Sequence, residues 1–169
     1  MALVLDGSLG VTFPVTAGSA SAVQASSGRV LQVVNVTYGT FTTFTTSTFV
    51  DSGLTASITP SNSTSKILVQ VNLAGCGKTG TDSAFVAKLV RGSTTITNME
   101  GNAGSTGTSA TSSIGTVAIS YLDSPSTTSS TTYKVQCLSA SNASSTRIND
   151  YYSGTNPSVC TMTLMEISA

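Results

Sequence analysis

Apolar and polar residues alternate over short stretches along most of this chain, and small polar residues separate the stretches. At residues 54–59, for example, Leu54, Ala56 and Ile58 fall on one face. A period of two residues is typical of a β-strand with one buried face, and no stretch sustains the 3.6-residue period of an amphipathic helix. The pattern therefore predicts an all-β protein.

About eight to ten short strands at regular spacing are typical of an antiparallel β-sandwich or a barrel, and we expect a jelly-roll-like sandwich. In the last strand, Glu166 falls on the same face as Cys160, Met162 and Leu164. The expected strands are residues 30–36, 40–45 with 48–50, 54–59, 66–73, 84–90, 93–99, 114–122, 133–139, 159–167 and, as a short strand or a loop, 147–152.

The first 28 residues differ from the rest, because they are rich in Gly, Ala and Ser with two brief strand-like pieces. We predict an extended arm at residues 1–28 that docks on another chain, followed by one sandwich domain at residues 29–169. The alternative for the arm is a partly disordered terminus, which is common. The docking residues would be the apolar ones of the two pieces, Leu3, Leu5, Val11, Phe13 and Val15.

Charged residues make up only 8% of the chain, and the formal net charge is zero. Without a basic patch, nucleic-acid binding is not expected, and no apolar run is long enough to insert into a membrane. The first residues lack the basic region of a signal peptide. The three cysteines, Cys76, Cys137 and Cys160, form no metal-like pair, so we expect reduced thiols in a protein made in a cytoplasm.

The stretch GCGKTG at residues 75–80 follows an apolar strand and resembles the end of a phosphate-binding loop. The full motif needs a glycine five residues before Gly77, where this chain has Asn72, and a helix after Thr79. The residues after Thr79 alternate as a strand does. We therefore predict a flexible hairpin loop here and no nucleotide site.

Catalytic chemistry has few candidates, because the chain contains no histidine to act as a general base. Cys76 beside Lys78 could be a reactive loop thiol, although an unreactive loop cysteine is the favoured interpretation. Asp123 and Asp150 could form a pair of carboxylates for glycoside hydrolysis. No supporting pattern surrounds them, so we predict that the protein is not an enzyme and uses no cofactor or metal.

The most ligand-like stretch begins at residue 147. Tyrosines beside amide, acidic and basic groups can stack on a sugar ring and bond its hydroxyls. The favoured alternative is a strand end whose tyrosines pack against a neighbouring subunit, since aromatic residues are enriched at interfaces. The candidate residues for a glycan or partner contact are Arg147, Asn149, Asp150, Tyr151 and Tyr152.

Five stretches, in this order, resemble a β-rich domain of virion proteins in tailed bacteriophages, notably cyanophages. They are GRVLQVV at 28–34, LTASITPSNSTSKILVQV at 54–71, KLVRGSTTI at 88–96, YLDSPSTTSSTTYKVQ at 121–136 and TLMEI at 163–167. The leader LDGSLGVTFPVTAGSA is similar to short repeats that precede such domains in tail fibres. The resemblance covers residues 28–169 and brings no catalytic residues.

The resemblance implies a structural virion protein, assembled in the bacterial host cytoplasm. Its most direct form is a short tail fibre or receptor-binding component, with the arm docked on tail or baseplate proteins. Residues 100–113 and 147–156 would then face a host surface glycan. Fibre proteins are usually longer, so the alternative is a capsid decoration (cement) protein on the major capsid protein. Homotrimers are usual in fibres, so a homo-oligomer is expected, with a trimer favoured.

Overall fold

The computed structural model describes residues 4–6, 10–12, 28–105, 112–141, 145–150 and 158–169, which form strands and turns with no helix among them. The strands, in chain order, are β1 (Val4–Asp6), β2 (Gly10–Thr12), β3 (Val30–Tyr38), β4 (Thr42–Phe44), β5 (Val50–Ile58), β6 (Lys66–Lys78), β7 (Phe85–Arg91), β8 (Thr94–Ala103), β9 (Ser112–Asp123), β10 (Thr131–Ser139), β11 (Thr146–Ile148) and β12 (Cys160–Ile167). The predicted all-β fold is confirmed. Strands β1 and β2 pair with each other, with Leu5 opposite Val11.

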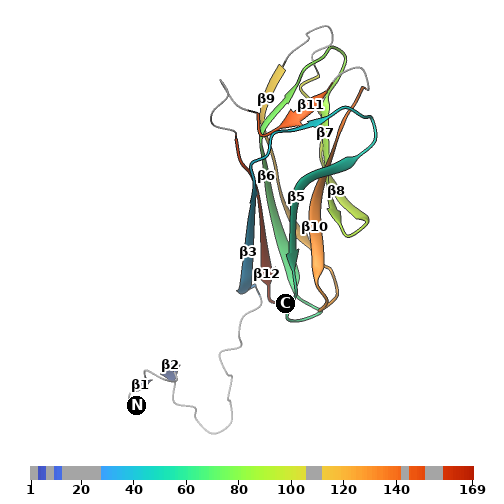
Figure 1. Cartoon of the computed structure of the whole chain (residues 1–169). Coiled ribbons are helices and arrows are strands. Elements are labelled where there is room, and N and C mark those ends of the chain that lie inside the picture. The colour runs from blue at the N-terminus through green and yellow to red at the C-terminus, as the bar shows by residue number, and fades with distance from the viewer. Residues whose placement is uncertain (1–3, 7–9, 13–27, 106–111, 142–144, 151–157) are drawn as a thin grey trace.

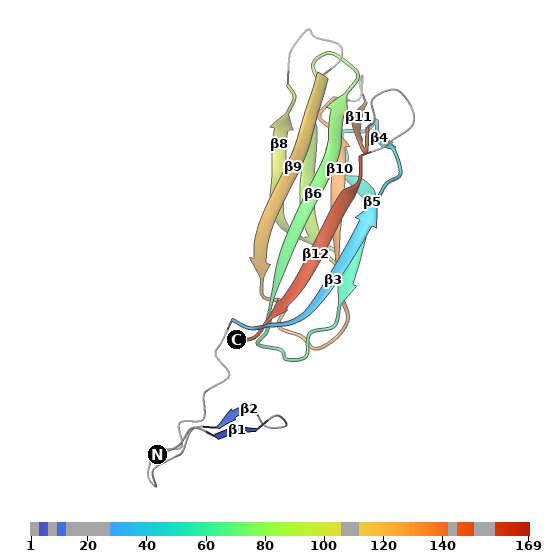
Figure 2. The ribbon, with the colours of Figure 1, turned by 90° about the vertical axis from the view of Figure 1, so that its left-hand side faces the viewer.

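Two antiparallel sheets pack face to face (Figures 1 and 2). One has the order β9–β6–β12–β3, and the short strands β11 and β4 extend it beside the last residues of β6. The other has the order β5–β10–β7–β8. Strand β3 pairs with β12, β5 with β10, β6 with β9 and β7 with β8, so each pairing is nested inside the one before. A long hairpin rolled up in this way is a jelly roll, as predicted.

The alternation seen in the sequence sets which side chains enter the core. Leu54, Ala56 and Ile58 of β5 are all buried, and so are Cys137 of β10 and Cys160 of β12. Burial of a whole aliphatic side chain stabilises the fold by roughly 1.5–3 kcal/mol. The sheets also meet through aromatic contact, since the rings of Phe44 and Phe85 lie 6.4 Å apart in a tilted arrangement.

Two strands are longer than the local pattern indicates. The expected strand at 66–73 continues to Lys78, because Gly77 and Lys78 pair with β9 on one side and β11 on the other. The expected loop at 100–113 is also shorter: β8 runs to Ala103 and β9 begins at Ser112, while residues 106–111 lie outside the described residues. The small residues in these two stretches are typical of loops. They are in strands here because neighbouring strands supply hydrogen bonds to their backbone groups.

We call the end of the sandwich where β3 begins and β12 ends the base, and the opposite end the far end (Figure 1). At the base, the N–H of Gly28 donates to the carbonyl of Ser168 at 2.8 Å, and the N–H of Ser168 donates to the carbonyl of Arg29 at 2.9 Å. The chain thus enters and leaves the domain at one place. The 13 residues of β6 place the far end about 40 Å away.

A buried carboxylate, Glu166, fixes the base on one side. Its side chain is fully buried on the inward face of β12, the face it shares with Cys160, Met162 and Leu164. Its oxygens accept hydrogen bonds from the N–H and hydroxyl of Ser61, at 2.8 and 2.6 Å, and from the amide of Gln32 at 2.6 Å. Burial acts to raise the pKa of Glu166, but the hydrogen bonds from Ser61 and Gln32 outweigh it and lower the pKa to about 2.

A second buried carboxylate, Asp123, lies across β6 from Glu166, because both residues pair with Ile67. One of its oxygens accepts a hydrogen bond from the guanidinium of Arg91 at 2.6 Å and another from the hydroxyl of Tyr133 at 2.7 Å. Burial, together with the hydrogen bond to this carboxylate, raises the pKa of Tyr133. The expected loop residue Asp123 is therefore the last residue of a strand and part of the inner structure.

We expect Glu166→Gln to lower the free energy of unfolding at pH 7 by about 3 kcal/mol, because the amide presents an NH₂ to donors that need an acceptor. The folded pKa lies below the ordinary value of 4.5, so the carboxylate stabilises the fold above that pH. This stabilisation is lost as the pH falls from 4.5 through about 2. Urea unfolding of both proteins from pH 7 to pH 2 measures the difference, which should shrink over that window.

The matched control is Glu100→Gln, which changes the chain's other glutamate in the same way. Among the described residues, the Glu100 carboxylate accepts its hydrogen bonds from the neighbouring N–H groups of Gly101 and Asn102, in the edge strand β8. Its substitution should change the free energy of unfolding by less than about 1 kcal/mol. A Glu166→Gln deficit that stays constant from pH 7 to pH 2 would contradict the assigned role of the ionised carboxylate.

Candidate functional site

The predicted ligand stretch lies at the far end of the sandwich, where β11 crosses the end of β6. Arg147 is in β11, and Asn149 and Asp150 follow it, whereas Tyr151 and Tyr152 lie outside the described residues. The structure thus brings three of the five predicted residues together beside β6. The glycan or partner contact itself stays a prediction.

Asn149 ties this stretch to three other parts of the fold. It is fully buried and has a positive φ of 55°, a conformation that asparagine tolerates better than most residues. Its side-chain oxygen accepts from the N–H of Cys160 at 3.0 Å, and its side-chain amide donates to the carbonyl of Thr40 at 2.9 Å. Its own N–H donates to the carbonyl of Ala74 at 2.9 Å. Asn149 therefore positions the stretch.

Arg147 and Asp150 form an ion pair at 2.6 Å between the guanidinium Nε and a carboxylate oxygen. Their side chains are 13% and 31% exposed, so Asp150 is the more accessible of the two. The N–H of Asp150 donates to the carbonyl of Gly75 at 3.1 Å. A hollow of about 490 Å³ adjoins this contact, bounded by Asp150, Ser158 and residues of β6 and β9. This hollow is the accessible part of the predicted ligand region.

The proposed pair of catalytic carboxylates does not form. Asp123 lies opposite Ile67 at the base, whereas Asp150 lies against Gly75 near the far end of the same strand. Eight residues of extended strand separate these two positions by about 25 Å. Two carboxylates that act on one glycosidic bond must lie within about 10 Å of each other, so this pair cannot do so.

The Gly-Lys-Thr stretch is not a phosphate-binding loop. Gly77 and Lys78 lie in strand β6, and the next element of the described chain is strand β7, with no helix between them. The amine of Lys78 is fully buried and donates to the carbonyl of Ser83 at 3.1 Å. The predicted hairpin loop therefore begins only at Thr79, after the end of β6.

The cysteines are all buried and free. The expectation that Cys76 lies in a loop is wrong, because it is inside β6 and only 1% exposed. Burial raises the pKa of its thiol to about 12, with a further contribution from nearby Cys160. A thiol with this pKa is protonated at neutral pH and is not a nucleophile. In the described ranges, no three His, Cys, Asp or Glu residues are placed to hold a metal ion.

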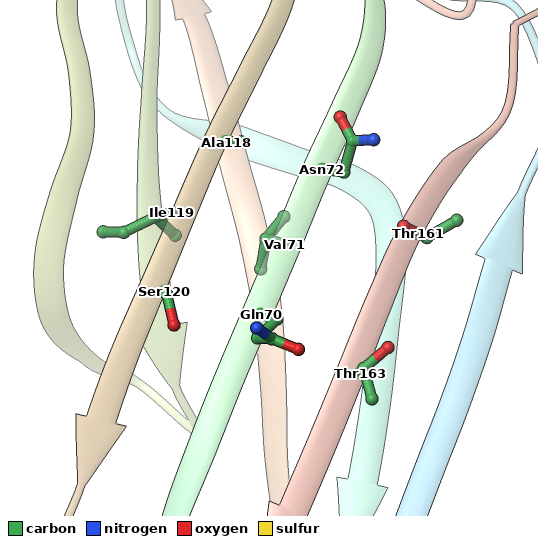
Figure 3. Close-up of a pocket in the computed structure, with 8 residues that line it drawn as sticks. All are labelled: Gln70, Val71, Asn72, Ala118, Ile119, Ser120, Thr161 and Thr163. Atoms are coloured by element: carbon green, nitrogen blue, oxygen red, sulfur yellow. The ribbon is translucent and has the colours of Figure 1, made fainter.

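The second candidate region, which sequence reasoning missed, is the outer face of the β9–β6–β12–β3 sheet. This face carries a shallow hollow of about 430 Å³. Figure 3 shows its lining, in which Gln70 and Asn72 of β6 lie between Ala118 and Ser120 of β9 and Thr161 and Thr163 of β12. Pairing across the four strands aligns the outward residues in three rows. They are Val33, Met165, Leu68 and Leu122; then Asn35, Thr163, Gln70 and Ser120; then Thr37, Thr161, Asn72 and Ala118.

None of the twelve residues in these rows carries a charge, and the first row is entirely apolar. Hydrogen bonding within the second row is direct, since the Asn35 amide donates to the Thr163 hydroxyl at 2.8 Å. We call this surface the uncharged face. A surface of this composition can pack against protein, because charged residues are depleted in the cores of interfaces.

No model of a known protein family matches this sequence, and no curated protein matches it either. Among the described residues, no helix has the length and apolar character needed to cross a membrane.

We expect Gly75→Ala to displace the Asn149–Asp150 stretch. A Cβ at Gly75 would lie 2.5 Å from the backbone nitrogen of Asp150 and 2.8 Å from its carbonyl oxygen, so backbone must move. Gly92→Ala is the control, because its φ of 57° matches the 59° of Gly75 and nothing lies within 4 Å.

Both variants introduce a left-handed alanine, which costs about 1–2 kcal/mol. Gly75→Ala should lose a further 1–3 kcal/mol or so through overpacking. The free energies of unfolding in urea, measured side by side, give this difference. Equal losses in the two variants would show that the contact between Gly75 and Asp150 does not hold the stretch.

Proposed function

We propose that this protein is a structural component of a tailed-phage virion, in the form of a short tail fibre or receptor-binding component. In this proposal, the N-terminal arm attaches the protein to tail or baseplate proteins. The sandwich then presents its far end to a host surface glycan, and the protein works as a homo-oligomer, with a trimer favoured.

One observation carries the proposal: the two buried carboxylates connect all five stretches that resemble phage virion proteins. Glu166, in TLMEI, bonds Gln32 in the first stretch and Ser61 in the second. Asp123 bonds Arg91 in KLVRGSTTI, and it bonds Tyr133 within its own stretch. The residues that carry the resemblance therefore also build the base of the domain together. A chance similarity between Ser/Thr-rich sequences would have no reason to fall on residues that contact one another.

The geometry of the domain also favours attachment at one end and presentation at the other. The chain enters the sandwich at Gly28, at the base, while the pair Arg147–Asp150 lies at the far end, beside the last residues of β6. A ligand at the far end would lie about 40 Å from the point of attachment. Separation of this kind suits a protein that bridges a particle and a cell.

Gold-labelled antibody against residues 28–169, applied to virions and viewed by electron microscopy, tests the location. Gold at the tail tip supports the proposal. Gold over the head would replace it with the capsid decoration protein, and particles without gold would overturn both forms.

We expect Tyr151→Ala with Tyr152→Ala to abolish adsorption to host cells while particles assemble normally, because tyrosine faces are the predicted glycan contacts. Val159→Ala is the control, as Val159 is 46% exposed beside the same stretch. Adsorption assays on purified particles measure the effect. Normal adsorption of the double variant would remove the tyrosines from the proposal.

Deletion of residues 2–15 should abolish incorporation into particles, because it removes the arm's apolar docking residues. Immunoblots of purified virions, with the soluble lysate as the control for expression, measure the loss. Incorporation at the wild-type level would remove the arm as the attachment device.

A further inference from the structure

The uncharged face combines an exposed apolar row with a broad polar area. In the apolar row, Val33 is 55% exposed and Leu122 is 50% exposed, at the two edges of the sheet. Val30 and Leu31, at the start of β3, lie closer to the base and are 52% and 43% exposed. Four of the seven large apolar side chains that are exposed in the described residues therefore lie near the base, on the two edge strands β3 and β9. Such clusters mark interaction sites on folded proteins.

We propose that the uncharged face packs against further copies of this same chain. The inference deepens the proposed function and rests on it for the choice of a homo-oligomer. The absence of charge is the first argument that the partner is a second copy of this chain. Partners of a different sequence are usually matched by opposite charge, and the twelve residues of the three rows offer none. When two copies of an uncharged face meet, no like charges are brought together.

Size is the second argument. Four strands at the usual spacing are about 19 Å wide, and four rows of outward residues extend about 27 Å along them. The fourth row, next to the base, contains Val30, Ile167 and the exposed Lys66, which places one charge at the rim of the footprint. The footprint is then about 500 Å² on each copy, or about 1,000 Å² for two, which is where specific interfaces begin. The apolar row would form the part of the interface from which water is excluded. The amides and hydroxyls of the other rows can form hydrogen bonds across the interface.

The position of the arm is the third argument. Gly28, from which the arm leaves, directly precedes Arg29 and the exposed residues of β3 at the edge of this face. Copies joined through the face would have their arms leave from adjacent points at the base. Several arms side by side could dock together, which strengthens attachment without any new contact to each arm.

The test measures the mass of the full-length recombinant protein by sedimentation and light scattering between about 1 and 100 μM, a range that covers typical homo-oligomer affinities. We expect an oligomer. The double variant Val33→Lys with Leu122→Lys should dissociate at least about 100-fold more readily, because it places ammonium groups in the contact. The control is Val50→Lys with Ser57→Lys, which changes two exposed residues of β5 in the other sheet.

The control should assemble as the wild type does, and circular dichroism should show both variants folded. A wild-type monomer at 100 μM, or equal assembly of the two double variants, would overturn the proposed face. Normal arm-dependent incorporation with a monomeric protein would leave the proposed virion role in place and remove the homo-oligomer from it. An oligomer that never labels virions would overturn that function and leave the face in place.

Thiol cross-linking gives a second test that does not weaken the contact. The native cysteines are all buried, so Ser120→Cys adds an accessible thiol in the second row of the uncharged face, on its edge strand β9. A short bis-maleimide should join Ser120→Cys chains to one another. Ser57→Cys, on an exposed position of β5, should stay uncross-linked. Equal cross-linking of both variants, or none of Ser120→Cys, would overturn the proposal.

Discussion

The base of the sandwich depends on two buried carboxylates that flank one residue of the central strand. Glu166 and Asp123 both pair with Ile67, from opposite sides. A buried carboxylate is tolerated only when hydrogen bonds replace its water. Each of these two receives such bonds from segments remote in the sequence, and this requirement fixes where the turns and strands of both sheets meet.

Strand β6 connects the base of the sandwich to its far end. Its first residues pair with β12 and its last with β11, while β9 follows it along the other side (Figure 2). The same strand thus borders the carboxylates of the base and the turn at Asn149–Asp150. Backbone pairing along both sides of this one strand therefore connects the two ends of a domain that has few charged residues.

Scarcity of charge also shapes the surface. On most exposed sheets, lysine and glutamate keep outward faces in water, whereas the outward rows of β9, β6, β12 and β3 contain amides, hydroxyls and aliphatic groups. Hydroxyl-rich turns satisfy their backbone locally, as Asn62 does by accepting from the N–H and hydroxyl of Thr64. Little of the stability of this domain rests on interactions that salt would screen.

The sequence by itself determined the all-β class, most strand positions and which residues of a strand share a face, Glu166 with Cys160, Met162 and Leu164 among them. These follow from alternation, which is a property of one strand and its own neighbours in the chain. Even the Gly-Lys-Thr stretch could be rejected as a nucleotide site, because the residues after it alternate as a strand does.

Only the tertiary structure decided the rest. Cys76 and Lys78 became buried because strands from elsewhere in the chain lie beside the end of β6, and Asn149 acquired partners at Thr40 and Cys160. The apolar row from Val33 to Leu122 exists only because four strands pair in one particular register. Register and neighbours depend on residues far apart in the chain, such as Val30 and Ile167, and no local pattern encodes which of them will meet.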